Sequence, residues 1–244
     1  MRVRIGKAIL GWGAVALILF SGAKVQAKGF EVTVLGAHGG LEDGNLSAYL
    51  LREQGANVGV LLDAGTVLNG MEKADAAHAF DRLTLPDDPK TSRAGGLVHH
   101  VIQGYLISHA HLDHVAGLIA VSPNDPGKPI YALPSVLSVM QDDLFNHRVW
   151  PNLADRGPKP ALGLFHYHDL LEGQSVPLAE TTLTVTSYPL SHGGVESTAF
   201  LLRSGADALL YLGDTGPDAV EHSNRLETLW RLMAPLVRAH QLRG

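Results

Sequence analysis

A cluster of histidine and aspartate residues in the middle of the chain has the residue types and the spacing of a metal site. Residues 108–117 read SHAHLDHVAG and contain four side chains that can ligate a metal ion: His109, His111, Asp113 and His114. Imidazole nitrogen and carboxylate oxygen suit zinc, iron or manganese. Because the sequence contains no cysteine, thiolate zinc sites and iron–sulfur clusters are excluded. The alternative is a polar loop whose histidines bind nothing.

The cluster directly follows an apolar run, residues 101–107, which predicts a buried strand that ends at the histidines. Side chains two positions apart share one face of an extended chain, so we expect His109 and His111 to point the same way. The chain then turns toward a helix. Asp113 and His114 can therefore face a second ion beside the first.

Two further potential ligands each follow a predicted strand. His192 lies in the segment YPLSHGG, and Asp214 lies in LYLGDTG. Site residues collect at strand ends in layered α/β folds. A carboxylate has two oxygens and can bridge two ions, so Asp214 is the expected bridge. The alternative for Asp214 is an ordinary Asp-Thr-Gly turn.

Strands that alternate with Gly-rich turns and helices predict one α/β domain. The expected strands are residues 30–35, 47–52, 58–63, 101–108, 129–133, 182–190, 197–203 and 208–212, of which 47–52 and 58–63 form a hairpin. The expected helices are residues 71–83, 135–145 and 221–242, the last interrupted near Pro235. Residues 86–96 are polar and predict a surface loop.

Residues 1–27 have the pattern of a secretory signal peptide, with basic residues before an uncharged run at 8–20 and cleavage expected after Ala27. That uncharged run is too short to cross a hydrocarbon core of roughly 30 Å, so we expect no membrane anchor and a periplasmic or secreted protein. Removing residues 1–27 leaves 15 basic and 24 acidic residues, a formal net charge of −9 instead of −5. This charge gives no general attraction to DNA or RNA.

Together these motifs resemble the metallo-β-lactamase superfamily, whose pattern is His-x-His-x-Asp-His followed by a further His and Asp. Within it, the chain resembles the class II 3′,5′-cyclic-nucleotide phosphodiesterases. The narrower resemblance lies in HAHLDHVAGLIAVSP at residues 109–123 and in residues 39–50, 61–66 and 213–218, and it covers about residues 30–244. It implies an αββα sandwich, with residues 28–244 as one phosphodiesterase domain.

The resemblance also implies two divalent metal ions, zinc foremost, with manganese or iron as alternatives. The implied ligands are His109, His111 and His192 for the first ion and Asp113 and His114 for the second, with Asp214 and a hydroxide as bridges. Such a hydroxide would attack a cyclic phosphate, that of cyclic AMP or cyclic GMP, and release a nucleoside 5′-phosphate. Asp113 is then the expected proton donor to the leaving 3′ oxygen, which makes Asp113 and Asp214 the expected catalytic residues.

Four further residues are candidates for the substrate pocket. Asn45 and Ser47 lie in a segment that shares the resemblance, and His166 could stack on a base. Asp63 ends a predicted strand and could orient a ligand histidine from behind. The alternatives are loop capping for Asn45 and Ser47, a surface position for His166 and a turn role for Asp63.

The family places one more histidine ligand after a further strand, whereas this sequence stops at Gly244. The histidines after Asp214 are His222 and His240, and both lie in a helical pattern. We therefore expect the last strand of the sandwich and one ligand of the second ion to be missing. The alternatives are another hydrolase of this fold (a tRNA-processing endonuclease, a lactonase or a β-lactamase) or an inactive metal-binding domain. The expected partner is a small cyclic nucleotide. We expect no binding to a nucleic acid polymer and, after signal cleavage, no attachment to a membrane, and a homodimer is possible.

Overall fold

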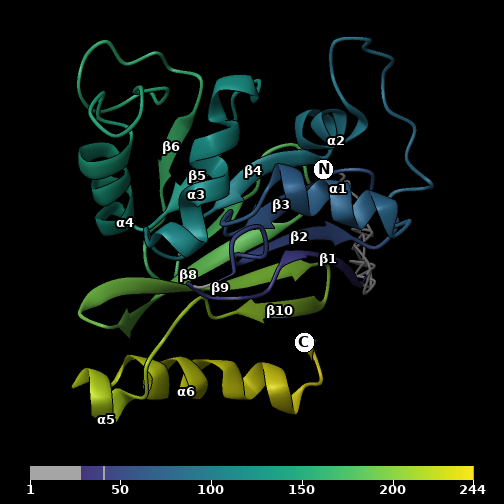
Figure 1. The fold of residues 1–244 in the computed structure, drawn as a ribbon. Helices are drawn as coiled ribbons and strands as arrows, with labels where there is room; N and C mark the ends of the chain where they lie inside the picture. Colours follow the sequence, from purple (N-terminus) through teal and green to yellow (C-terminus); the bar gives the residue numbers. More distant parts are fainter. Residues whose placement is uncertain (1–28, 41, 244) are drawn as a thin grey trace, which may run out of the picture.

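Two β-sheets packed face to face form the centre of the protein, and helices cover both outer faces (Figure 1). The computed structural model describes residues 29–40 and 42–243, so the expected signal peptide lies outside the described residues. Within these ranges, no helix has both the length and the apolar character needed to cross a membrane. This layering confirms the αββα sandwich expected from the sequence.

The first sheet has six strands in the order β1-β2-β3-β4-β5-β6. Their bounds are β1 Phe30–Gly36, β2 Ala48–Glu53, β3 Gly59–Leu62, β4 Ile102–Leu106, β5 Pro129–Ala132 and β6 His166–Asp169. β1, β2 and β3 pair antiparallel, and β3 to β6 pair parallel. The parallel strands therefore end at the same edge of the sheet.

The second sheet has five strands in the order β11-β10-β9-β8-β7. Their bounds are β7 Ser175–Pro177, β8 Thr184–His192, β9 Val195–Ser204, β10 Asp207–Tyr211 and β11 Leu242–Arg243. β7 to β10 pair antiparallel, whereas the two-residue β11, which the sequence pattern does not predict, pairs parallel with β10.

The helices lie outside the two sheets. Their bounds are α1 Leu68–Ala76, α2 Arg93–Val101, α3 Leu112–Val121, α4 Pro134–Val139, α5 Asp218–Glu221 and α6 Arg225–Arg238. α1 to α4 lie on the first sheet and α6 on the second (Figure 1). A short 3₁₀ turn, Ser122–Asn124, follows α3, and a π-helical turn, Met140–Leu144, follows α4.

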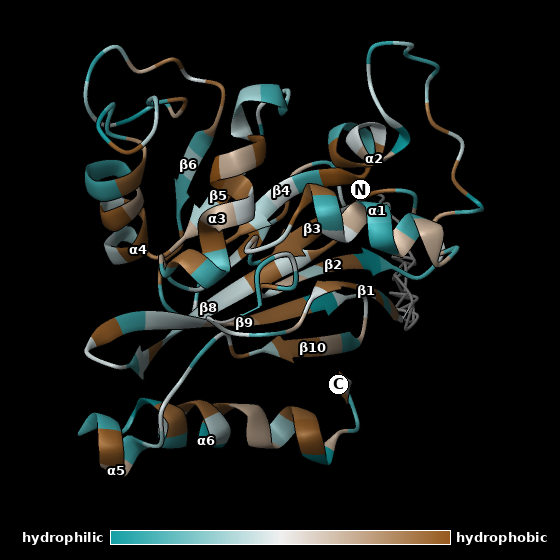
Figure 2. Cartoon of the chain, viewed as in Figure 1, coloured by the Kyte–Doolittle hydropathy of each residue, from teal (hydrophilic) through white to brown (hydrophobic). Residues whose placement is uncertain are grey.

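Buried hydrophobic residues pack in the space between the layers. Much of the length of the sheet strands is hydrophobic (Figure 2). β3 is buried along its whole length, which explains why it reads as an unbroken apolar run. β1 is an edge strand, and Val32 and Val34 alternate outward from it. α6 turns Leu229 and Met233 toward the second sheet and leaves its other face to solvent.

Four expectations about where helices begin and end are wrong. The helix expected at 71–83 is α1, which ends at Ala76 because His78 adopts a left-handed backbone with a φ of 65°. The loop expected at 86–96 ends sooner, because the side chain of Ser92 accepts the N–H of Gly95 and starts α2.

The third and fourth concern the last part of the chain. α6 runs through Pro235, which lies on the solvent side of the helix. Proline has no N–H to bond the carbonyl one turn earlier, and on this side water can bond that carbonyl instead. His222 and His240 are not inside helices. Each follows a helix end and has a left-handed φ, 51° and 53° respectively.

Candidate metal centre

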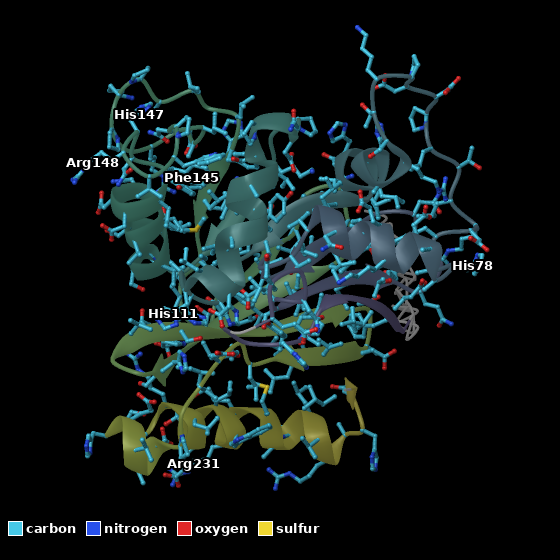
Figure 3. All side chains as sticks on the ribbon, in the orientation of Figure 1. His78, His111, Phe145, His147, Arg148 and Arg231 are labelled. Carbon is cyan, nitrogen blue, oxygen red and sulfur yellow. The ribbon has the colours of Figure 1, made fainter. Side chains whose placement is uncertain are left out.

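Strand ends of both sheets bring the expected ligands together. His109 and His111 follow β4, and His111 is the N-cap residue directly before α3. His114 lies in the first turn of α3. His192 is the last residue of β8, and Asp214 follows β10 by three residues. His111 lies between the two layers (Figure 3).

The first group of possible ligands consists of three histidines. The ligand atoms of His109, His111 and His192 all lie within 4.8 Å of one another. His109 Nε2 is 3.0 Å from His111 Nδ1, and the ring of His192 is centred 5.1 Å from that of His109. This is the set expected for the first ion.

The second group consists of His109, His114 and Asp214, also within 4.8 Å. The two oxygens of Asp214 face different histidines: Oδ1 is 3.4 Å from His114 Nε2, and Oδ2 is 3.6 Å from His192 Nε2. Asp214 thus connects the two groups. Asp113 lies beside the second group but outside it, with Oδ2 3.8 Å from His114 Nε2.

The side chains present fit divalent metal ions. His114 is buried, and its Nε2 has no hydrogen-bond partner among the described residues although it points into the cluster. A buried polar atom without a partner is costly, and a metal ion would satisfy it. Burial, and then the neighbouring His114, lowers the pKa of His109 to about 4. His109 is therefore neutral at neutral pH, which is the form that binds metal.

A buried carboxylate orients His114 from behind. Asp63 Oδ2 is 2.7 Å from His114 Nδ1, so we assign the proton to Nδ1 and leave Nε2 as the ligating atom. Burial lowers the pKa of His114, but the hydrogen bond and charge of Asp63 outweigh it, so the pKa is raised. The sequence leaves two roles open for Asp63, and the structure favours the first: its side chain contacts His114, one of the expected ligands.

Asp63 is itself held by a set of donors that the sequence motifs do not single out. The N–H and Oγ–H of Ser108 each donate to it at 2.7 Å, and the hydroxyl of Tyr211 donates at 2.6 Å. Burial, and then the charge of Asp63, raises the pKa of Tyr211 well above its usual value. The only sequence signal for Ser108 and Tyr211 is their position, one residue before His109 and three before Asp214.

Close packing fixes α3, which carries Asp113 and His114. A Cβ on Gly117 would lie 2.7 Å from the carbonyl oxygen of Ala64 and 2.7 Å from the backbone nitrogen of Val67. The N–H of Leu118 donates to that same Ala64 oxygen at 3.0 Å. Only glycine at 117 lets the helix lie this close to the chain that leaves β3.

The glycine-rich loop after β1 reaches the site through its backbone. The N–H of Gly40 donates to Asp113 Oδ2 at 3.0 Å. Asn45 Oδ1 accepts the N–H of Ala37 at 3.2 Å, which closes the loop. Ser47 is buried, and its carbonyl accepts the N–H of Gly65 at 2.9 Å. Contact of Asn45 and Ser47 with substrate stays a prediction.

The structure does not bring His166 to the ligand cluster. His166 is the first residue of β6 and pairs with Pro129, the first residue of β5, whereas the ligands lie beyond the last residues of the parallel strands. Its Nδ1 is 3.4 Å from Asp155 Oδ2. The expected base contact of His166 therefore does not fit this arrangement.

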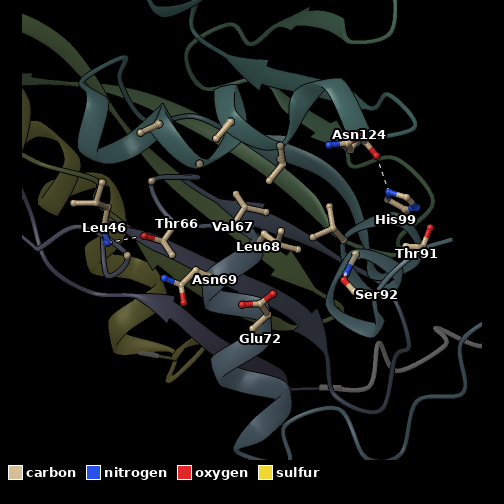
Figure 4. Close-up of a pocket in the computed structure, with 18 of the residues that line it drawn as sticks. Leu46, Thr66, Val67, Leu68, Asn69, Glu72, Thr91, Ser92, His99 and Asn124 are labelled. Carbon is tan, nitrogen blue, oxygen red and sulfur yellow. Dashed lines mark hydrogen bonds between the residues drawn. The ribbon is translucent and has the colours of Figure 1, made fainter. Parts of the chain in front are cut away.

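A separate groove of about 960 Å³ runs between α1, α2 and α3 (Figure 4). The residues that line it include Leu46, Val67, Leu68, His99 and Asn124. None of the expected metal ligands borders it. The groove is thus distinct from the candidate metal centre.

The two packed sheets, their outer helices and the expected ligands at the strand ends define a protein of the metallo-β-lactamase fold. Among solved structures, unliganded yeast PDE1 matches with a TM-score of 0.73 at 22% sequence identity, over 88% of this chain and 73% of that one.

Comparison of sequences narrows this class. The model of the class-II cAMP phosphodiesterases matches residues 30–244. The chain is 44% identical over 220 residues to a 3′,5′-cyclic-nucleotide phosphodiesterase of Aliivibrio fischeri, covering 90% of this chain and 67% of that relative. It is 41% identical over 242 residues to a probable 3′,5′-cyclic-nucleotide phosphodiesterase of Yersinia pestis, covering 99% and 70%. The chain belongs to the class-II cAMP phosphodiesterase family, as its motifs indicate.

Proposed function

We propose that the protein hydrolyses 3′,5′-cyclic nucleotides to nucleoside 5′-phosphates at a centre of two divalent metal ions, with zinc as the first candidate. Membership of the family and the names of its bacterial relatives support the substrate. The main observation in favour of the metal centre is the position of Asp214. Its two carboxylate oxygens lie 3.4 Å from His114 Nε2 and 3.6 Å from His192 Nε2. One carboxylate thereby joins two groups of ligands.

His109, His111 and His192 would hold one ion, and His114 with Asp113 the other, with Asp214 between them. Manganese or iron suits the same nitrogen and oxygen donors. Bound there, divalent ions would activate a water molecule at neutral pH and offset the charge of the phosphodiester.

The charge of the site supports this need for cations. Three carboxylates, those of Asp63, Asp113 and Asp214, lie around the ligand cluster. They would repel the anionic phosphodiester of a cyclic nucleotide unless positive charge lay between them and the substrate.

The residues of the chain have separate roles in this proposal. Asp63 accepts the Nδ1–H of His114 and keeps Nε2 aimed at the cluster. Asp113 is the proposed proton donor to the 3′ oxygen that leaves when its bond to phosphorus breaks. Gly40 donates to Oδ2 of Asp113, so Oδ1 is the oxygen that would carry the proton. The predicted signal peptide supports action in the periplasm or outside the cell.

A turnover assay tests the proposal. The protein expressed from the full 244-residue sequence is loaded with zinc, and release of 5′-AMP and 3′-AMP from cyclic AMP is followed. We expect 5′-AMP, lost in His111→Ala and retained in the matched control His166→Ala, whose side chain lies away from the cluster. Release of 3′-AMP would refute the direction of ring opening. Hydrolysis of bis(p-nitrophenyl) phosphate without turnover of either cyclic AMP or cyclic GMP would refute the substrate.

A further inference from the structure

The β8–β9 hairpin carries His192 at its tip. β8 ends at His192, β9 begins at Val195, and His192 and Val195 pair directly across the turn. The two turn residues, Gly193 and Gly194, have left-handed φ values of 58° and 87°, as a tight two-residue turn requires. A Cβ on either glycine would meet nothing within 4 Å. Side-chain packing at these two positions therefore does not hold the tip.

A carboxylate from another element holds it instead. The N–H of Gly193 donates to both carboxylate oxygens of Glu221, each at 3.1 Å. Glu221 is the last residue of α5, which begins four residues after Asp214. Hydrogen bonds to an ionised carboxylate are stronger than those between neutral groups.

The loop that follows Asp214 makes room for this side chain and adds its own bonds to the hairpin. A Cβ on Gly216 would lie 2.1 Å from Oε1 of Glu221, so a side chain at residue 216 would force the carboxylate to move from its present position. The carbonyl of Ser191 accepts the N–H of Gly216 at 3.1 Å and the hydroxyl of Thr215 at 3.2 Å. Bonds from the Asp214 segment therefore reach the residues on both sides of His192.

We infer that Glu221 is a positioning residue that fixes His192 relative to Asp214. It acts through the backbone N–H of Gly193, and it thereby raises the affinity for the ion that the three-histidine group would hold. This inference rests on the proposed metal centre. Its two observables are the protection of the Gly193 amide and the affinity for metal.

Four variants of the full-length protein separate this role from a general effect on folding. Glu221→Ala removes the carboxylate, and Glu221→Gln keeps one oxygen that can accept the Gly193 N–H. Gly216→Ala displaces the Glu221 side chain without changing its chemistry. Glu227→Ala is the matched control, because Glu227 lies on α6, is exposed and pairs with Arg231.

Amide hydrogen exchange of the metal-free proteins and zinc competition with a chromophoric chelator give the readouts. We expect faster exchange at Gly193 and about 10- to 100-fold weaker zinc binding at one site in Glu221→Ala, the range typical for groups that orient a ligand. Gly216→Ala should change the exchange rate and the zinc affinity in the same directions. Glu221→Gln restores most of both, Glu227→Ala matches the wild type, and melting temperatures stay close together.

Wild-type exchange at Gly193 and wild-type zinc affinity in Glu221→Ala would overturn the inference. An equal loss of zinc affinity at both sites in Glu221→Ala would also overturn it, if Glu221→Gln did not restore the affinity and the loss followed the melting temperature. That pattern is expected of a residue that only stabilises the fold. If the wild-type protein bound no zinc, the proposed metal centre would be refuted and the affinity claim with it. The Gly193 exchange rates would then decide separately whether Glu221 holds the hairpin.

Discussion

Replacing Asp63 with asparagine should weaken metal binding at the proposed centre while leaving the fold nearly intact. Oδ2 of Asp63 accepts from three donors, namely His114 Nδ1 at 2.7 Å, Ser108 Oγ at 2.7 Å and Tyr211 OH at 2.6 Å. Oδ1 accepts from the backbone N–H of Ser108 at 2.7 Å. An amide has one accepting oxygen and one donating nitrogen, so it cannot satisfy both sides.

Each orientation of the amide has a definite cost. If the amide NH₂ faces His114, Nδ1 must become an acceptor, and the proton moves to Nε2, the atom needed for the metal. If the amide oxygen faces His114, the NH₂ opposes the N–H of Ser108, which costs about 1–3 kcal/mol for an unpaired buried donor. We therefore expect zinc affinity to fall about 10- to 100-fold, or about 1.4–2.7 kcal/mol.

The assay is zinc titration against a competing chelator, with the melting temperature of the metal-free protein measured in parallel. Asp155→Asn is the matched control, because Asp155 contacts His166 Nδ1 at 3.4 Å, away from the ligand cluster. Nitrogen NMR of His114 reports which ring nitrogen carries the proton. Wild-type zinc affinity in Asp63→Asn, with the proton still on Nδ1, would refute the orienting role of Asp63.

Three further predictions concern packing, a buried ion pair and pH. Gly117→Ala should lower the unfolding free energy by about 1–3 kcal/mol in urea titrations, although alanine favours helices, because its Cβ would lie 2.7 Å from the carbonyl of Ala64. Lys128→Met should lower it by about 3–5 kcal/mol, because the buried Asp125 then loses an ammonium at 2.7 Å. Burial, and then Asp125, raises the pKa of Tyr105 well above 10.0, so its contribution to stability is present below pH 10 and lost as the pH rises through 10 toward the folded-state pKa. Tyr105→Phe should flatten the alkaline decline by up to about 1.4 kcal/mol per pH unit.

Each of these has a control. Gly96→Ala, in α2, brings its Cβ to 3.2 Å from a flexible methyl of Leu85 and should leave stability unchanged or higher. An equal loss in both glycine variants would contradict the packing argument. The double variant Asp125→Asn with Lys128→Met removes both charges and should recover part of the loss, and failure to do so would point to lost packing rather than charge. Parallel alkaline curves for Tyr105→Phe and the wild type would exclude Tyr105 as the titrating group.

The sequence was informative where chemistry and strand pattern coincide. His109, His111 and His114 follow an apolar run that forms β4, so their grouping could be anticipated from spacing alone. His192 and Asp214 could be added because each follows a strand in the second sheet. Their distances from one another depend on how the two sheets pack, which no local pattern contains.

Other parts of the site depend on contacts between distant segments. Tyr211 and Asp63 are 148 positions apart and meet because β3 and β10 lie in facing sheets. The position of His166 depends on β6, whose four residues are mostly polar and show no strand pattern. α6 continues through Pro235 because that turn is exposed to solvent. Helix propensities take no account of exposure, so they could not predict this.

The division of the expected ligands between the two sheets would link metal binding to the stability of the whole domain. His109, His111 and His114 belong to the six-stranded layer, whereas His192 and Asp214 belong to the five-stranded layer. An ion held by both sets would cross-link the two layers, and separating the layers would break its bonds to one of the sets. At a free ion concentration about 1,000 times the dissociation constant, such binding would add about 4.1 kcal/mol to the unfolding free energy. The supply of metal in the surroundings would then set how long the folded enzyme survives, as well as how fast it works.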